Sequence, residues 1–189
     1  IEGPAAVKEE IPAEICGLNV VFTDNQEHYR TRKVRILNGA HTSLVPVAYL
    51  YGIDKVRESL EDDVVGTFLK DTIFNEICTT LDLPEEELSQ FSEDVLDRFR
   101  NPYLEHALMS ISLNSTSKYK TRVLPSVLEY IKRKNKNPKH LLFSLAALIA
   151  FYRGEREEGR FKIKDDQSAL DFFATQWACL LYTSDAADD

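Results

Sequence analysis

Apolar residues recur at helical spacing along most of the chain. The clearest example is residues 31–51, where aliphatic side chains return every three or four positions and so share one face of an α-helix. Pro46 lies inside this stretch and predicts a kink, because proline lacks the backbone N–H that a helix interior needs. The same spacing predicts further helices over residues 55–81, 83–101, 103–112, 124–134, 137–154 and 165–177. The pattern therefore predicts a mainly α, multi-helical fold.

Two stretches break the helical pattern. Residues 17–24 carry β-branched and aromatic side chains between a glycine and an Asp-Asn pair, which predicts a strand, and with it one short strand pair near the start of the domain. The polar residues 114–118 predict a loop. We therefore expect residues 1–30 to be the end of an inter-domain connection that carries the candidate strand, and residues 31–177 to form the helical domain.

The two ends of the chain have unusual sequences. Residues 178–189 follow the last predicted helix without turn residues or an amphipathic continuation. They are similar to the translated read-through of a sequencing adapter, so we interpret them as a non-native tail and assign them no function. The chain also begins at Ile1 without an initiator methionine, as we expect of a piece of a longer protein.

Composition narrows the function classes. The formal charge is −8, and the basic residues are dispersed apart from a short run at residues 132–136, which we interpret as a solvated loop. A nucleic-acid-binding domain needs a net basic face, so we expect no nucleic-acid partner. No apolar run reaches the roughly 18–20 residues of a membrane span, so we expect no membrane contact. Three cysteines without a CxxC pair predict free thiols in a reducing compartment, the cytoplasm: Cys16, Cys78 and Cys179.

Three polar residues interrupt the apolar face of the first long helix. At about 100° per residue, Lys33, Asn38 and His41 fall within an arc of roughly 140° that they share with the aliphatic side chains. An amine, an amide and an imidazole that converge on an apolar-walled cleft suit proton transfer at a hydroxyl or a carbonyl. Desolvation at such a position would lower the pKa of Lys33 and make its neutral form available as a base.

A structural explanation of the same three residues stays open. The lysine would then extend its amine to water, the histidine would be a satisfied core residue, and the asparagine would bond a neighbouring backbone group. A metal site is not expected, because none of the four histidines pairs with a second His or Cys at ligand spacing. The three cysteines lack a local basic partner and predict no nucleophile.

Two motifs link the chain to a known family. The K-x4-N-x2-H motif, which comprises Lys33, Asn38 and His41, resembles the signature of the polyol-specific long-chain dehydrogenases. The later segment with the order "DRFRNP…SK…LPS" resembles the C-terminal domain of the same family, and the similarity runs from Ile1 to about Trp177. The resemblance implies a two-domain NAD-dependent oxidoreductase in which a Rossmann domain precedes a mainly helical substrate domain.

This chain resembles the second domain only. No GxGxxG motif occurs in it, so the phosphate-cradling turn of a Rossmann domain is absent from the sequence. The resemblance therefore implies that NAD is bound mainly by the missing N-terminal domain, that the chain alone is inactive, and that its own cofactor-binding residues are unknown. No metal is implied.

The resemblance also implies roles for the three residues of the long helix. Lys33 would act as the general base in the oxidation of a hydroxyl and as the acid in the reverse reaction. Asn38 would hydrogen-bond the reacting oxygen and so polarise the carbonyl. His41 would orient the substrate and the lysine.

Within the family, the chain is most similar to the hexuronate-pathway reductases, which implies a small sugar acid as the substrate. Lys118 matches a substrate-contacting lysine of the mannitol enzymes, but Ser110 stands where those enzymes tend to have an arginine, and this puts a polyol substrate in doubt. A carboxylate would be recognised by an arginine or a lysine, and the arginine candidates are Arg30, Arg32, Arg35 and Arg122. Of these, we expect Arg35 and Arg122 to bind the substrate. A fructuronate or mannitol reductase of the same family and a non-enzymatic helical interaction module remain the alternatives.

Overall fold

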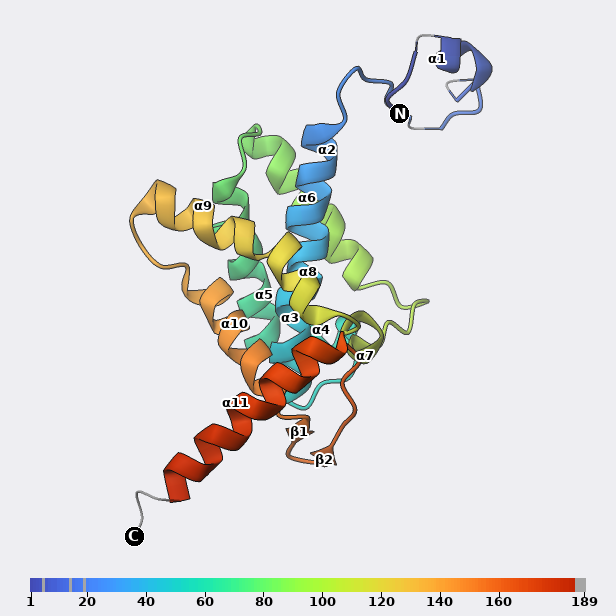
Figure 1. Ribbon diagram of the computed structural model, residues 1–189. Helices are drawn as coiled ribbons and strands as arrows, with labels where there is room; N and C mark the ends of the chain where they lie inside the picture. Colours follow the sequence, from blue (N-terminus) through green and yellow to red (C-terminus); the bar gives the residue numbers. More distant parts are fainter. Residues whose placement is uncertain (5, 14, 19, 186–189) are drawn as a thin grey trace.

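A computed structural model describes residues 1–4, 6–13, 15–18 and 20–185, and the described part is mainly helical (Figure 1). This confirms the mainly α fold class. The helical elements, with π and 3-10 turns written η, are α1 Ala6–Glu10, α2 Glu27–Arg32, η1 Lys33–Asn38, α3 Gly39–Leu50, α4 Val56–Glu61, α5 Asp63–Asp71, η2 Thr72–Ile77, η3 Cys78–Thr80, α6 Glu85–Phe99, α7 Leu108–Ile111, α8 Ser115–Arg122, α9 Leu124–Lys134, α10 Lys139–Phe151 and α11 Gln167–Asp185.

The long helix predicted at residues 31–51 is confirmed, and it begins four residues earlier than predicted. The elements α2, η1 and α3 follow one another without a break, and Pro46 lies inside α3. The helix ends before Gly52, whose φ of 98° lies in the left-handed region that a side chain rarely adopts. The turn at Gly52 thus separates the long helix from α4.

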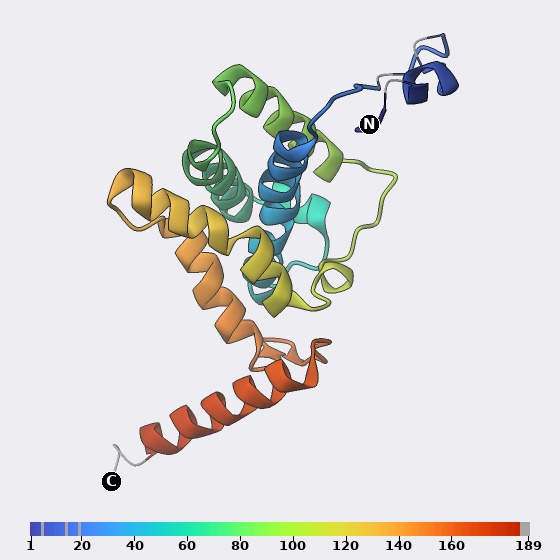
Figure 2. The same ribbon diagram turned by 45° about the horizontal axis from the view of Figure 1, so that its top comes forward.

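Helix α3 forms the centre of the fold. Most of its residues are buried, including the small residues Gly39, Ala40 and Ser43, as expected for a helix that is packed on several sides. Helix α10 packs along it, and α5, α7 and α8 contact it from other directions (Figure 2). Large side chains such as Leu44, Ile77 and Phe151 are fully buried around this centre. The long helix therefore places its first half at the edge of the bundle and its second half in the core.

The predicted strand at residues 17–24 is wrong. Its described residues form turns and irregular backbone, with one isolated bridge between Glu2 and Thr23. A strand needs a partner that pairs along its length, and the described part of the chain offers this segment none. The sheet that the structure does contain is a two-residue antiparallel hairpin near the end of the domain, β1 Glu155–Arg156 and β2 Gly159–Arg160. The short strand pair is thus present, but not near the start.

Three local predictions also need correction. The segment 114–118 is not a loop, because helix α8 begins at Ser115 directly after Asn114, whose φ is 54°. The helix predicted at residues 103–112 is reduced to the single turn of α7, and the residues before α7 are irregular. The basic run at 132–136 mostly lies in the last turn of α9 rather than in a loop, where positive charge is favourable to the helix dipole.

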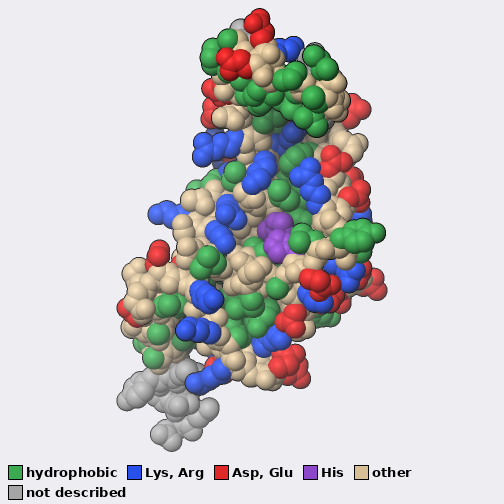
Figure 3. Space-filling view, turned by 90° about the vertical axis from the view of Figure 1, so that its right-hand side faces the viewer, with side chains coloured by type: hydrophobic (Ala, Val, Ile, Leu, Met, Phe, Trp, Pro, Cys, Tyr) green, Lys and Arg blue, Asp and Glu red, His purple; other side chains and the backbone are tan. Residues whose placement is uncertain are grey.

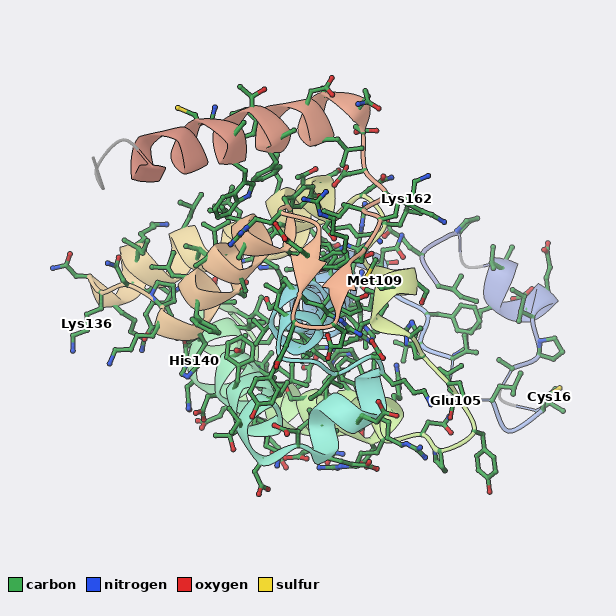
Figure 4. The ribbon with its side chains drawn as sticks, turned by 90° about the horizontal axis from the view of Figure 1, so that it is seen from below. Cys16, Glu105, Met109, Lys136, His140 and Lys162 are labelled. Carbon is green, nitrogen blue, oxygen red and sulfur yellow. The ribbon has the colours of Figure 1, made fainter. Side chains whose placement is uncertain are left out.

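The two ends of the chain extend from the helical bundle in Figure 1. The described residues before α2 lie apart from it, and the exposed thiol of Cys16 lies in this segment (Figure 4). At the other end α11 continues past Trp177 to Asp185, so the last helix is longer than predicted. Residues 186–189 of the interpreted tail lie outside the described residues.

Within the part of the chain that the structure describes, none of the helices combines the length and the apolar composition needed to cross a membrane.

Candidate active site

The long helix places Lys33, Asn38 and His41 along one of its sides. In a regular α-helix Asn38 would lie roughly 140° around the axis from Lys33, because it is five residues further along. The segment Lys33–Asn38 instead forms a π turn, whose hydrogen bonds span five residues, so Asn38 follows Lys33 after one turn. His41 comes three residues later in α3, at the spacing of α-helical neighbours. The π turn therefore aligns three side chains that a regular helix would spread apart.

The three side chains differ in their exposure. Asn38 and His41 are half-buried, but Lys33 is exposed, so the prediction of a desolvated lysine is wrong for this chain. The physical reason is that α6 and α8 flank the π turn without enclosing it, and Ile36 is the one buried residue of the turn. The line of polar groups thus runs from the surface at Lys33 toward the interior at His41.

The imidazole of His41 is neutral at physiological pH. Burial is the main cause that lowers its pKa to about 3. The neighbouring groups His106, Arg122 and Lys33 act in the same direction, because a positive charge disfavours a second one nearby. The ring nitrogen Nε2 is buried and has no hydrogen-bond partner among the described residues. In a neutral imidazole, this nitrogen can donate a hydrogen bond to a hydroxyl group that enters the site or accept one from it, depending on the tautomer.

Two rings, one from the end of α6 and one from the segment that follows it, hold the imidazole in place. Phe99 stacks on His41 with 4.0 Å between ring centroids and an interplanar angle of 27°. His106 meets His41 edge-on, with centroids 5.3 Å apart. Phe99 belongs to the "DRFRNP" motif, so the structure brings the two sequence motifs into contact. No role was predicted for His106 from the sequence, although it follows this motif by only four residues.

A hollow of about 510 Å³ opens beside Asn38. Its lining includes three arginines and one acid, Arg30, Arg35, Arg122 and Glu27. The Nε atom of Arg35 donates to the Ser126 hydroxyl at 2.8 Å, which fixes one edge of the guanidinium and leaves the other donors available. Burial lowers the pKa of both Arg35 and Arg122, so both charges are partly desolvated. Partly desolvated guanidinium groups bind carboxylates strongly, and the hollow suits an anionic group.

Lys118 lies in helix α8, one turn before Arg122. Its Nζ donates to the Ile111 carbonyl at 2.8 Å, which uses one of its three donors. Burial is the main cause that lowers the pKa of Lys118, Arg122 adds to this effect, and Asp165 opposes it. Ser110, the position at which the sequence departs from the mannitol enzymes, is exposed and donates to the Ala107 carbonyl. The structure thus places Lys118 and Arg122 on the same helix beside the polar line.

Figure 3 shows a face of the molecule on which histidine atoms lie among Lys, Arg and hydrophobic side chains, with Asp and Glu side chains on the same face. In the described residues, no group of three or more His, Cys, Asp or Glu side chains is placed to hold a metal ion.

Comparison with known sequences assigns the domain. The profile of the family described as the mannitol dehydrogenase C-terminal domain matches residues 25–177. The chain belongs to this family. The match covers most of the helical domain and includes every candidate site residue named above.

Curated relatives share the sequence over almost the whole chain. An altronate oxidoreductase of Yersinia pestis bv. Antiqua (strain Nepal516) is 49% identical over 177 residues, which are 94% of this chain and 37% of that protein. An altronate oxidoreductase of Pectobacterium carotovorum subsp. carotovorum (strain PC1) is 49% identical over 183 residues, 94% of this chain and 38% of that protein. The chain therefore spans a little over a third of the length of these relatives.

Solved structures share the fold. A Pseudomonas fluorescens mannitol 2-dehydrogenase, in a ternary complex with NAD and D-mannitol, superposes with a TM-score of 0.74 and 22% identity, over 83% of this chain and 32% of that chain. A substrate-free D-sorbitol dehydrogenase gives a TM-score of 0.74 and 23% identity over the same shares of the two chains. At these identities the similarity shows the fold alone, which agrees with the helical domain predicted from the sequence.

Proposed function

We propose that this chain is the substrate-binding and catalytic domain of an NAD-dependent tagaturonate reductase (altronate oxidoreductase), which interconverts D-altronate and NAD with D-tagaturonate and NADH. The observation that carries the proposal is the line of Lys33, Asn38 and His41, of which Asn38 also lines a hollow that contains arginines. Altronate oxidoreductases that are 49% identical over 94% of the chain support the choice of substrate.

The chain's own residues fit the substrate half of this reaction. The sequence contains no GxGxxG motif, and the sheet in the described part is a two-strand antiparallel hairpin, so no residue here is assigned to hold the phosphates of NAD. NAD, when bound by a domain outside this chain, supplies the hydride acceptor for the oxidation. We propose that the chain is inactive without that domain and acts in the cytoplasm, in agreement with the free thiols of Cys16 and Cys78.

In the proposed mechanism Lys33 is the proton-transfer group. In the oxidation, the neutral Nζ of Lys33 takes the proton from the reacting hydroxyl, and the carbon that carries this hydroxyl gives up a hydride. In the reduction, the charged Nζ returns the proton to the alkoxide oxygen. Lys33 is exposed, so its amine is open to a hydroxyl group that binds beside the helix.

The neighbouring residues bind and orient the substrate. Asn38, one turn from Lys33, donates its amide N–H to the reacting oxygen and stabilises negative charge on it. His41 contacts a substrate hydroxyl through Nε2 and so fixes the sugar chain relative to the lysine. Arg35 and Arg122 bind the carboxylate in the hollow, and Lys118 contacts a further oxygen with its remaining donors.

The test of the proposed function uses a full-length enzyme that joins this chain to an NAD domain. Replacing Lys33 by Ala should lower kcat for tagaturonate by about 10²–10⁴-fold, the usual contribution of a general acid–base, without changing NADH binding. Lys136→Ala, a change of an exposed lysine in the turn after α9 (Figure 4), is the matched control and should leave kcat unchanged. Turnover of Lys33→Ala near the wild-type value would refute the base assignment.

Substrate choice is tested by comparing the rates of NADH oxidation with tagaturonate, fructuronate and fructose. We expect tagaturonate to have the highest kcat/KM, since the hollow beside Asn38 offers arginines to a carboxylate. Fastest use of fructose would overturn the sugar-acid assignment, and fastest use of fructuronate would change the substrate but keep its class.

A further inference from the structure

The first turn of helix α8 is capped by a residue far along the chain. Asn114, directly before the helix, has a left-handed backbone and provides no side-chain cap. The cap comes from Asp165, whose Oδ2 accepts the Thr116 backbone N–H at 3.1 Å and the Thr116 hydroxyl at 3.0 Å. The backbone N–H of Asn114 donates to the Lys164 carbonyl at 3.0 Å. Two consecutive residues of the segment before α11 therefore hold the start of α8.

The carboxylate of Asp165 is itself fixed in position. The Tyr152 hydroxyl donates to Oδ2, and the Asp166 backbone N–H donates to Oδ1 at 2.8 Å. Partial burial raises the pKa of Asp165, but the hydrogen bonds from Tyr152 and Thr116 outweigh it and keep the pKa below its ordinary value. Asp165 is thus a charged, immobilised acceptor, and it links α8 to the end of α10.

Helix α8 carries two of the candidate substrate-binding residues. Lys118 and Arg122 are four residues apart, so they lie on the same face of the helix. The charge of Asp165 also acts on Lys118, because it opposes the lowering of the lysine pKa by burial and by Arg122. The segment that carries Asp165 also includes Lys162, and it passes near α7, the helix that contains Met109 (Figure 4).

We propose that Asp165 is a positioning residue, which holds the start of α8 through Thr116 and thereby sets where Lys118 and Arg122 meet the substrate. The proposal rests on the proposed function, because it takes these two residues to bind a sugar acid. Asp165 acts through Thr116, Lys118 and the helix that joins them, and it takes no part in proton or hydride transfer.

The kinetic test uses the full-length enzyme with Asp165→Ala and Asp165→Asn. We expect Asp165→Ala to raise KM for the sugar acid about tenfold, the equivalent of one lost charge-assisted hydrogen bond, with kcat changed less than about threefold and NADH binding unchanged. Asp165→Asn keeps an oxygen that accepts the Thr116 N–H, so it should restore most of the wild-type KM. Asp166→Asn removes an exposed carboxylate next to the cap and is the matched control, with no change expected.

Two results would overturn the positioning role. One is a KM of Asp165→Ala equal to that of Asp166→Asn. The other is a parallel loss of kcat, substrate binding and NADH binding, which would indicate general unfolding rather than a local shift of α8. If Asp165→Ala prevents folding, Thr116→Val provides the second variant, because it removes the hydroxyl donor and keeps the backbone N–H. A KM of Thr116→Val equal to the wild-type value would then overturn the proposal.

A separate NMR measurement on the 189-residue chain distinguishes failure of this proposal from failure of the proposed function. An inactive wild-type full-length enzyme would refute the function alone. The cap is then judged from the amide signal of Thr116 and the side-chain CεH₂ signals of Lys118. Both should shift in Asp165→Ala, which removes the acceptor, and stay in place in Asp166→Asn. Unchanged signals in Asp165→Ala would refute the cap whatever the enzyme assay shows.

Discussion

The enclosed imidazole of His41 makes the stability of the domain depend on pH. Its surroundings lower its pKa from 6.5 to about 3, chiefly through burial. Between these two values the unfolded chain binds a proton that the folded chain excludes, so the free energy of unfolding falls as the pH decreases, by about 1.4 kcal/mol per pH unit. The contribution is fully present above pH 6.5, and about 2 kcal/mol of it is lost between pH 6.5 and pH 5.

The assay is urea denaturation of the chain at pH 7, 6 and 5, for the wild type and for His41→Asn, whose side chain does not titrate. The wild type should lose about 2 kcal/mol more than the variant over this range. Carboxylates contribute little to this difference, because their unfolded pKa values lie below pH 5 and both proteins share them. His28→Asn changes an exposed histidine and should follow the wild type. Equal pH dependence of the wild type and His41→Asn would refute the reasoning.

Two further predictions concern stability. Glu76 is 4% exposed, and its carboxylate accepts the backbone N–H groups of His140 and Leu141 at 2.9 and 2.8 Å. Glu76→Ala should therefore lower the free energy of unfolding by about 3 kcal/mol. A loss below about 0.5 kcal/mol in urea denaturation would contradict the capping role. A Cβ atom on Gly66 would lie 2.6 Å from the Leu60 carbonyl oxygen. Gly66→Ala should therefore destabilise the fold by at least about 2 kcal/mol. An unchanged Tm in a thermal melt would contradict the close packing.

The helices that pack in the core were predictable because burial imposes a period on the sequence. Helix α10 lies within the predicted range 137–154, and α6 within 83–101. Helix α8 was missed because its sequence is almost entirely polar, with Tyr119 as its one buried aromatic residue, and what stabilises its start is Asp165, which is remote in sequence. No local pattern encodes such a cap.

The strand prediction failed for a related reason. The β-branched and aromatic residues at 17–24 satisfy the local preference of a strand, but a strand is stable only when a neighbour completes its hydrogen bonds. In the described part of the chain this segment meets Glu2 at one bridge. The observed hairpin of β1 and β2 is too short to produce an alternating pattern, so periodicity could not reveal it.

The candidate site was found from residue types, and its geometry could not be read from the sequence. A wheel at 100° per residue spreads Lys33, Asn38 and His41 over roughly 140° of the helix, too wide for all three to contact one substrate. The π turn removes this difficulty, because a spacing of five residues becomes one turn. The five-residue spacing therefore brings Lys33 and Asn38 to the same side of the helix only where the backbone adopts the π conformation. An inserted or deleted residue in this interval would rotate the lysine away from the amide without altering either side chain.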